Sequence, residues 1–377
     1  MQTDIDWGIV MNLANVIEGH SDDRRALIDG ETVVTFGELR DRVSALRSQL
    51  ASMGISRGDS VALAAGNEVH FATGALAVLG LGAIVMPVNP QSPPAELRLR
   101  IDMVQPRLLL VGDDGQGLLG IDDELGVEAL DMTTLAAVPV TDPDPGIVDV
   151  EPDDRAFYMA TSGVSGAPKV AILSHYNLRW VQEAMGQGLD PMQPDDITLG
   201  CLSFAHIFGL NVVLLYGLRV GSCIVLQRRF DADESLRLIR EHGVTVLAGA
   251  PPMWQRWAKA DAPDDSLSTI RFAASGAAAL PLGVFETIRD RYGVEVAQGY
   301  GLTETSPVVT MGRGYAVRPS SVGKVLDGVT VALVDDNGMP VDIGDEGEVV
   351  VKGPGIFHGY LDDQAMTDAV LTADGWF

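Results

Sequence analysis

A run of small, hydroxyl and glycine residues that ends in a lysine is the part of the sequence best suited to bind phosphate. It spans Thr161–Lys169 and follows an apolar run, Ala156–Ala160, that predicts a buried strand. Glycines let the backbone approach a ligand closely, and successive N–H groups, hydroxyls and one ammonium can converge on a phosphate chain. It is not a Walker A motif, because Pro168 precedes the lysine and Val170 follows it. An ordinary hairpin loop is the alternative interpretation.

Two further clusters each follow a predicted strand. Gln298–Thr305 comes directly after Val294–Ala297, and Ser275–Ala278 comes directly after Ile270–Ala274. Ligands of α/β sheets bind at the carboxyl ends of strands, so both clusters are well placed for a site. In the first, an aromatic ring between glycines can stack on a base, and a hydroxyl and a carboxylate can reach phosphate and Mg²⁺. In the second, small residues admit a flat ligand.

The segment Leu202–Leu210 contains one histidine, His206, among apolar residues. A histidine in such surroundings is more often a core residue than a catalytic one, so both interpretations stay open on the residues alone. The segment contains no aspartate that could bind an ammonium group.

These segments, in this order, resemble the motifs of the adenylate-forming superfamily, which includes acyl-CoA synthetases, peptide-synthetase adenylation domains and luciferases. The resemblance covers roughly residues 30–377. Its supporting landmarks are Thr35–Leu39, Gly58–Ala62, Gly82–Pro87, Asn89-Pro90, Gly347–Pro354 and Gly359-Tyr360. Two positions depart from the family pattern: Val164 stands in place of a threonine, and Val170 in place of a glycine.

The resemblance implies a role for each motif. The catalytic residues would be Lys169, Thr303, Glu304 and His206, and Glu304 would also hold Mg²⁺. The residues that contact ATP would be Thr161, Ser162, Gly163, Ser165, Gly166, Lys169, Gly276, Ala277, Gln298, Gly299, Tyr300, Gly301 and Thr303.

The reaction implied is ATP-dependent activation of a carboxylic acid, expected to be a fatty acid, followed by thioester formation with coenzyme A. Apolar residues from Trp180–Met185, Ile207–Leu210 and Pro252–Trp254 would line the acyl tunnel. One alternative is a ligase that loads an acyl carrier protein. Another is a non-catalytic nucleotide- or acyl-binding protein, which the two valines motivate.

Composition narrows the class of protein. The 377 residues are 46% hydrophobic and carry a formal charge of −26, which argues against non-specific binding of nucleic acid or anionic membranes. Two cysteines, Cys201 and Cys223, give no disulfide framework and fit a reducing compartment, so a cytoplasmic location is expected. The N-terminus has no signal-peptide pattern, and no apolar run reaches the length of a membrane span.

Strand-like and helix-like runs alternate along most of the chain and predict an α/β fold. We expect two packed βαβ-type sheet subdomains over residues 1–316 and a small β-rich subdomain, a distorted barrel, over residues 317–377. Phe377 directly precedes the position of the family's Thr-Gly-Asp, so the mobile C-terminal domain with its catalytic lysine is expected to be missing from this chain. The chain is therefore expected to be the ATP- and acyl-binding fragment of the enzyme and to be inactive alone. The expected elements include helices over Thr35–Met53, His175–Gln187, Ile207–Leu218 and Leu282–Tyr292, and strands over Ser60–Ala65, Leu108–Val111 and Cys223–Leu226.

Overall fold

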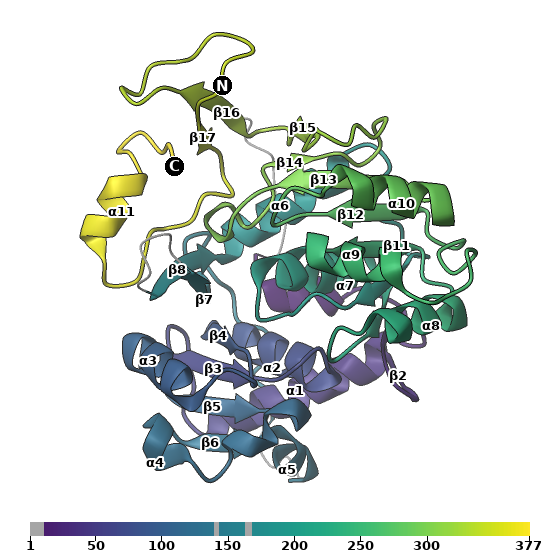
Figure 1. Cartoon of the computed structure of the whole chain (residues 1–377). Coiled ribbons are helices and arrows are strands. Elements are labelled where there is room, and N and C mark those ends of the chain that lie inside the picture. The colour runs from purple at the N-terminus through teal and green to yellow at the C-terminus, as the bar shows by residue number, and fades with distance from the viewer. Residues whose placement is uncertain (1–10, 139–142, 163–167) are drawn as a thin grey trace.

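A computed structural model describes residues 11–138, 143–162 and 168–377 (Figure 1). It contains a six-stranded sheet in the N-terminal part, whose inner strands pair in parallel and whose last strand is antiparallel to its neighbour. In spatial order these strands are β6 (Ala129–Asp131), β5 (Leu108–Val111), β3 (Ser60–Ala64), β4 (Ile84–Val88), β7 (Arg155–Ser162) and β8 (Pro168–Ser174). The helices of this part are α1 (Phe36–Ser52), α2 (Val69–Gly80), α3 (Pro94–Val104), α4 (Asp122–Leu125) and α5 (Met132–Ala137).

A nine-stranded sheet forms the second layered unit. Its six central strands are parallel, so their carboxyl ends meet at one edge. In spatial order the strands are β15 (Lys324–Val325), β14 (Thr310–Met311), β13 (Val296–Tyr300), β12 (Phe272–Ser275), β11 (Val246–Gly249), β9 (Ile197–Gly200), β10 (Cys223–Leu226), β1 (Arg25–Asp29) and β2 (Thr32–Thr35).

Helices pack beside the nine-stranded sheet, and an antiparallel strand pair comes after it in the chain (Figure 1). The helices are α6 (His175–Gln187), α7 (Tyr216–Val220), α8 (Ala232–His242), α9 (Pro251–Lys259) and α10 (Leu282–Tyr292). The strand pair is β16 (Thr330–Val334) with β17 (Glu348–Lys352), and α11 (Gln364–Val370) comes after it. Short 3₁₀ helices form η1 (Leu13–Ile17), η2 (Asp113–Leu118) and η4 (Thr303–Thr305). The expected α/β fold with two sheet units and a β-rich C-terminal part is confirmed.

The sequence explains several element boundaries. Thr35 caps α1 and Glu38 returns the interaction: the Glu38 N–H donates to Thr35 Oγ1 at 3.2 Å, and the Thr35 N–H donates to Glu38 Oε2 at 2.9 Å. Ser174 and Asn177 form the same reciprocal pair at the start of α6. The predicted helix over Ile207–Leu218 is instead a π-helical segment, η3 (Phe208–Leu215), that runs into α7.

The two sheet units share a core. Buried side chains of α1 and α2 pack in one cluster with those of η3 and α7, and the rings of Phe71 and Phe204 lie 5.4 Å apart across this contact. A second cluster fills the space between the nine-stranded sheet and α8, α9 and α10. Within the described ranges, no helix combines the length and the hydropathy that a membrane crossing requires.

Candidate active site

The carboxyl edge of the nine-stranded sheet positions the first part of the site. After β12 the chain passes through Gly276 and Ala277, and Ala277 has a φ of 71°, a left-handed conformation that is uncommon for a residue with a side chain. The ring of Phe208, from η3, lies against Gly276: a Cβ built there would come 3.0 Å from the ring. The loop is therefore narrow, and an aromatic side chain of η3 faces it.

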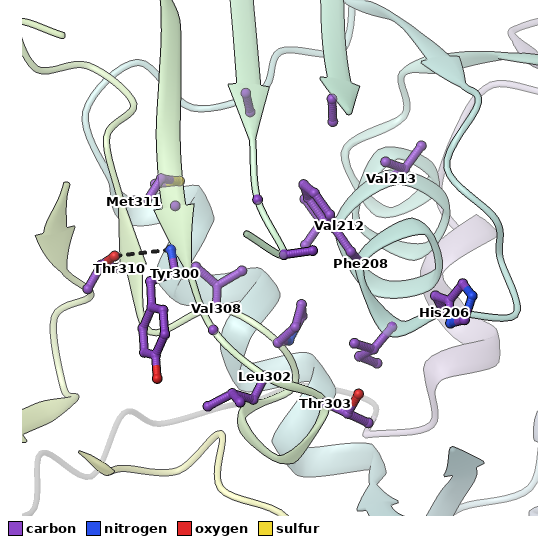
Figure 2. A pocket seen from close by; sticks show the side chains of 18 of the residues that line it. His206, Phe208, Val212, Val213, Tyr300, Leu302, Thr303, Val308, Thr310 and Met311 are labelled. Atoms are coloured by element: carbon purple, nitrogen blue, oxygen red, sulfur yellow. Dashed lines mark hydrogen bonds between the residues drawn. The ribbon is translucent and has the colours of Figure 1, made fainter. Parts of the chain in front are cut away.

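The neighbouring strand, β13, ends in the cluster that the sequence singled out. The Tyr300 N–H donates to Thr310 Oγ1 at 3.2 Å, which ties the end of β13 to β14 (Figure 2). Gln298 accepts a hydrogen bond from the Leu280 N–H at 2.8 Å and donates to the Pro319 carbonyl. The chain then turns through η4, so Thr303 and Glu304 follow Tyr300 at the same edge.

Lys169, Glu304 and Tyr360 come together from three distant parts of the chain. Residues 358–361 pair with the outer edge of β8 through hydrogen bonds between His358 and Ile172 and between Leu361 and Val170. This pairing brings the Tyr360 hydroxyl to Glu304 Oε1, to which it donates at 2.7 Å, and the Tyr360 ring under Lys169 Nζ at 5.0 Å. Burial and the carboxylate of Glu304 raise the pKa of the Tyr360 phenol, which therefore stays protonated and donates.

One cavity of about 930 Å³ joins these parts. Figure 2 shows Phe208, Val212 and Val213 on one side of it and Val308 and Met311 on the other. The sequence-predicted residues that line it are Thr161, Lys169, His206, Gly276, Ala277, Gln298, Gly299, Tyr300, Gly301, Thr303 and Glu304. Gly163, Ser165 and Gly166 lie outside the described residues, as does Val164, and Ser162 is described only as the last residue of β7.

His206 lines the cavity (Figure 2). Its surroundings desolvate the ring, and the charge of Arg100 adds to this effect, so the pKa of His206 lies below its ordinary value. The histidine is therefore mostly neutral at pH 7 and can accept a hydrogen bond from, or donate one to, a bound acid.

Many of the side chains that line the cavity are apolar, as expected for a site that binds an acyl group. Met185, Ile207 and Phe208, from the first two of the three predicted tunnel segments, are among them. The assignment of Pro252–Trp254 is wrong: Trp254 is fully buried in the core cluster on α9, where its Nε1 donates to the carbonyls of Gly249 and Ala274. Helical spacing shows that α9 has a buried face but not whether that face meets core or cavity.

Sequence reasoning missed several cavity residues. Tyr360 belongs to a segment that resembles a family landmark, and the resemblance assigns it no role. Thr198, Tyr216 and Arg313 also line the cavity, and no local pattern marks them. Their only sequence signal is position: Thr198 lies in a strand of the sheet, and Arg313 follows the Gln298–Thr305 cluster by eight residues.

A second group of side chains has the composition of a metal site, but an arginine side chain already lies among them. Glu68, His70 and Asp113 place ligand atoms within 4.8 Å of one another. The guanidinium of Arg228 lies among them, with Nη1 3.3 Å from Glu68 Oε2 and Nη2 3.0 Å from Asp113 Oδ2. The group is therefore an internal ion-pair network, and Glu304 remains the predicted metal ligand.

Comparisons with known proteins agree with this geometry. The family model described as "AMP-binding enzyme" matches residues 13–361. The chain is 31% identical to 4-coumarate–CoA ligase 5 of Oryza sativa, over 94% of this chain and 69% of that protein. It is 30% identical, over 93% of this chain and 72% of the other, to a CoA ligase of Rhodococcus jostii named for a propanoyl group on a dioxo-octahydro-indene ring.

Among solved structures, ATP-bound MatB from Rhodopseudomonas palustris superposes with a TM-score of 0.89 at 26% identity, over 98% of this chain and 75% of that one. The match of the family model across most of the chain, together with these relatives, identifies the fold and its motifs. The chain belongs to the AMP-binding enzymes, the adenylate-forming superfamily that its sequence resembles.

Proposed function

We propose that this chain binds ATP and a carboxylic acid and joins them into an acyl-adenylate, as part of an AMP-forming acid–CoA ligase. A carboxylate is a poor acyl donor, and adenylation gives it a leaving group by expelling pyrophosphate. The observation that carries the proposal is the shared cavity: Lys169, Glu304 and Tyr300 lie at one end of it, and an apolar channel continues from them. The cavity thus offers room for both substrates at a common point.

The residues have distinct tasks in this proposal. Lys169 makes no hydrogen bond or ion pair with another residue of the described ranges, so its ammonium is available for phosphate oxygens. The ring of Tyr300 and the narrow loop at Gly276 would enclose the adenine. Thr303 would donate its hydroxyl to a phosphate, and His206 would orient the carboxylate. Positioning two reactants in this way removes much of the entropic part of the barrier.

The residues present fit Mg²⁺. Mg²⁺ is commonly held by one or two carboxylates together with substrate phosphates, and Glu304 supplies one carboxylate at the cavity wall. The Tyr360 hydroxyl fixes one oxygen of that carboxylate and leaves the other for a ligand. When bound, Mg²⁺ would offset phosphate charge.

The identities of the carboxylic acid and of the thiol that accepts the acyl group are separate proposals. A fatty acid remains our prediction from the resemblance, but the relatives reported above are named for other acids, so an acid panel must include aromatic ones. Coenzyme A is the proposed acceptor, and a carrier protein is the alternative that a thioester assay with each acceptor separates. We assign the thioester step to the C-terminal domain that the resemblance implies. We also propose residues 1–316 and 317–377 as the subdomain division.

The test is ATP binding by calorimetry, together with acid-dependent pyrophosphate release by an enzyme that includes the C-terminal domain implied by the resemblance, because this chain alone should turn over negligibly. Lys169→Ala should weaken ATP binding or slow adenylation about 10- to 100-fold, because a hydrogen bond to a charged group contributes about 1.5–3 kcal/mol. Lys259→Ala is the matched control, since Lys259 is exposed on α9 and does not line the cavity. If the wild type, Lys169→Ala and Lys259→Ala bind ATP equally and release pyrophosphate at equal rates, the proposal is refuted.

A further inference from the structure

The acyl end of the cavity has a defined depth along the nine-stranded sheet. Ala248, Ala274 and Ala297 lie in one register row and line the cavity, so small side chains leave space above the sheet. Two residues earlier on their strands, Val246 and Phe272 form the next row. From Gly276 to Phe272 the strand extends about 13 Å, at roughly 3.3 Å per residue. The channel therefore runs from the carboxyl edge to the amino ends of the strands.

A buried guanidinium lies at this deep end. Arg313 lines the cavity, its side chain is 5% exposed, and its guanidinium carbon lies 4.2 Å from the centre of the Phe272 ring. Its Nε and Nη2 are buried and have no hydrogen-bond acceptor among the described residues. An unpaired buried polar group costs free energy, and a charged one costs more. Burial accordingly lowers the pKa of Arg313.

Elsewhere in the chain the same two nitrogens bind carboxylates. Four arginines direct Nε and Nη2 together at one acidic side chain, the geometry in which the planar guanidinium binds a carboxylate with two parallel bonds. These arginines are Arg47, Arg228, Arg237 and Arg271. At Arg313 no described residue supplies such an acceptor.

The nearest acidic partner of Arg313 is already engaged. Asp190 Oδ2 lies 3.9 Å from Arg313 Nε, too far for a hydrogen bond, and Asp190 Oδ1 accepts from Arg271 Nη1 at 2.9 Å. Asp196 binds Arg271 with both oxygens. Two carboxylates and two guanidinium groups balance in charge here, but the acceptors are directed at Arg271.

Two further polar groups at the same end have no hydrogen-bond partner in the described part of the chain. Thr198 is paired in register with Val246, and its buried Oγ1 makes no hydrogen bond there. The buried hydroxyl of Tyr216 lies near the backbone of Met192 but makes no hydrogen bond of ordinary geometry with a described residue. All of these residues line the cavity. An apolar channel would normally end in apolar side chains, and this one ends in three groups that can donate hydrogen bonds.

We propose that Arg313, with Tyr216 and Thr198, forms a specificity subsite for an oxygen acceptor at the far end of the acid. The preferred substrate is then a carboxylic acid that ends in a carbonyl or a second carboxylate, rather than in a methyl group. This inference rests on the proposed function and narrows its acid away from a plain fatty acid. An acid lacking the oxygen would bury the guanidinium without an acceptor, and sites built to hydrogen-bond a substrate discriminate strongly against such analogues.

The experiment compares three acids of comparable length: decanoic, 9-oxodecanoic and decanedioic acid. Pyrophosphate release, by enzymes that include the C-terminal domain implied by the resemblance, gives kcat/KM for each acid with the wild type, Arg313→Met and Tyr216→Phe. Calorimetry gives the affinity for ATP. Arg289→Met is the matched control, because Arg289 also stacks on a phenylalanine ring but is exposed on α10. Thermal unfolding checks that each variant is folded.

The wild type and Arg289→Met should have a kcat/KM for 9-oxodecanoic or decanedioic acid about 10-fold or more above that for decanoic acid. Comparing the first two acids shows whether the subsite prefers a carbonyl or a carboxylate. Arg313→Met should lose this preference or favour decanoic acid, and Tyr216→Phe should reduce it. A gain for decanoic acid cannot arise from misfolding. Equal or greater wild-type activity with decanoic acid, or a preference unchanged by Arg313→Met, overturns the inference while adenylation stands. Absence of both ATP binding and pyrophosphate release overturns the proposed function, and the inference falls with it.

Discussion

Gly301 shows how strictly single residues shape the site. It lies between Tyr300 and Leu302, where the chain leaves β13 and turns into η4. A Cβ built on Gly301 would lie 1.5 Å from the carbonyl oxygen of Pro307, a distance that no packing tolerates. Any side chain here forces the backbone of the turn apart, and with it the groups at Tyr300 and Glu304.

We expect Gly301→Ala to lower the melting temperature and weaken ATP binding by at least about 10-fold, because the loop must shift to admit the methyl group. Gly283→Ala is the control: Gly283 is exposed on α10, and a Cβ there meets nothing within 4 Å. A helical Gly→Ala change should stabilise by about 0.5–1 kcal/mol. Unchanged ATP binding by a folded Gly301→Ala protein would contradict the role given to the turn.

At the residue scale the sequence predicts the parts of the site that lie in continuous motifs. Lys169, Tyr300 and Glu304 follow strands within short, distinctive segments, and the structure places them at one cavity. Tyr360 and Arg313 could not be found in this way. Their neighbours in the site come from segments far away in the chain, and the resulting contacts depend on packing that local patterns do not encode.

At the element scale, η3 forms the cavity wall that faces the nine-stranded sheet, and Asn211 holds η3 in place. Asn211 is fully buried. Its Oδ1 accepts from Gln182 Nε2 at 2.8 Å, and its Nδ2 donates to the carbonyls of Leu178 at 3.2 Å and Ser306 at 2.7 Å. One side chain thus joins η3 to α6 and to the turn that follows Glu304. π-Helical segments are often found at functional sites.

Asn211→Ala should lower the free energy of unfolding by about 2–4 kcal/mol, because it leaves several buried polar groups without partners. Chemical denaturation measures this change. Asn337→Ala is the control, since Asn337 is exposed in the turn after β16, and its substitution should change stability by less than about 0.5 kcal/mol. Equal effects of the two substitutions would show that Asn211 does not hold the wall.

The regular elements were largely predictable. The structure confirms the helices His175–Gln187 and Leu282–Tyr292 and the strands Leu108–Val111 and Cys223–Leu226 with the bounds that their patterns indicate. η3 was not predictable as a π-helix. Its residues are apolar on nearly all sides, so the sequence shows a buried helical run without the periodicity that would separate one helical form from another.

On the scale of the whole molecule, a partly buried ion-pair network joins the two sheet units. Glu68, which precedes α2, is fully buried beside Arg228, which follows β10, and Arg228 also binds Asp29 of β1 with two bonds. Gly112 leaves the room for this contact, since a Cβ there would come 2.1 Å from Glu68 Oε1. Burial, and then the charge of Asp113, raise the pKa of Glu68 to about 7.

This shift makes the stability depend on pH. The pKa of Glu68 in the folded chain, about 7, lies above the ordinary value of 4.5, so the folded protein holds a proton that the unfolded chain releases. The contribution of Glu68 to stability is therefore present below pH 4.5 and is lost as pH rises through 7. Glu68→Gln stays neutral, so the wild type should lose stability relative to this variant between pH 5 and pH 8. Parallel pH profiles in denaturation experiments would contradict this assignment.

The assembly of the sheets was the least predictable feature. β1 and β2 are the first two strands of the described chain, yet they belong to the nine-stranded sheet, where Leu27 pairs with Ile224 (Figure 1). Local patterns indicate strands but not partners, and about two hundred residues separate β1 from β10. The alternation of strands and helices therefore predicts the α/β class, while the strand order depends on long-range packing.

The most direct test of the account is a crystal structure of the protein with a non-hydrolysable ATP analogue and Mg²⁺. We predict that the triphosphate lies beside Lys169, that the adenine rests against Tyr300, and that the metal contacts Glu304. A nucleotide bound elsewhere on the molecule, with the space between Lys169 and Glu304 empty, would contradict the central claim.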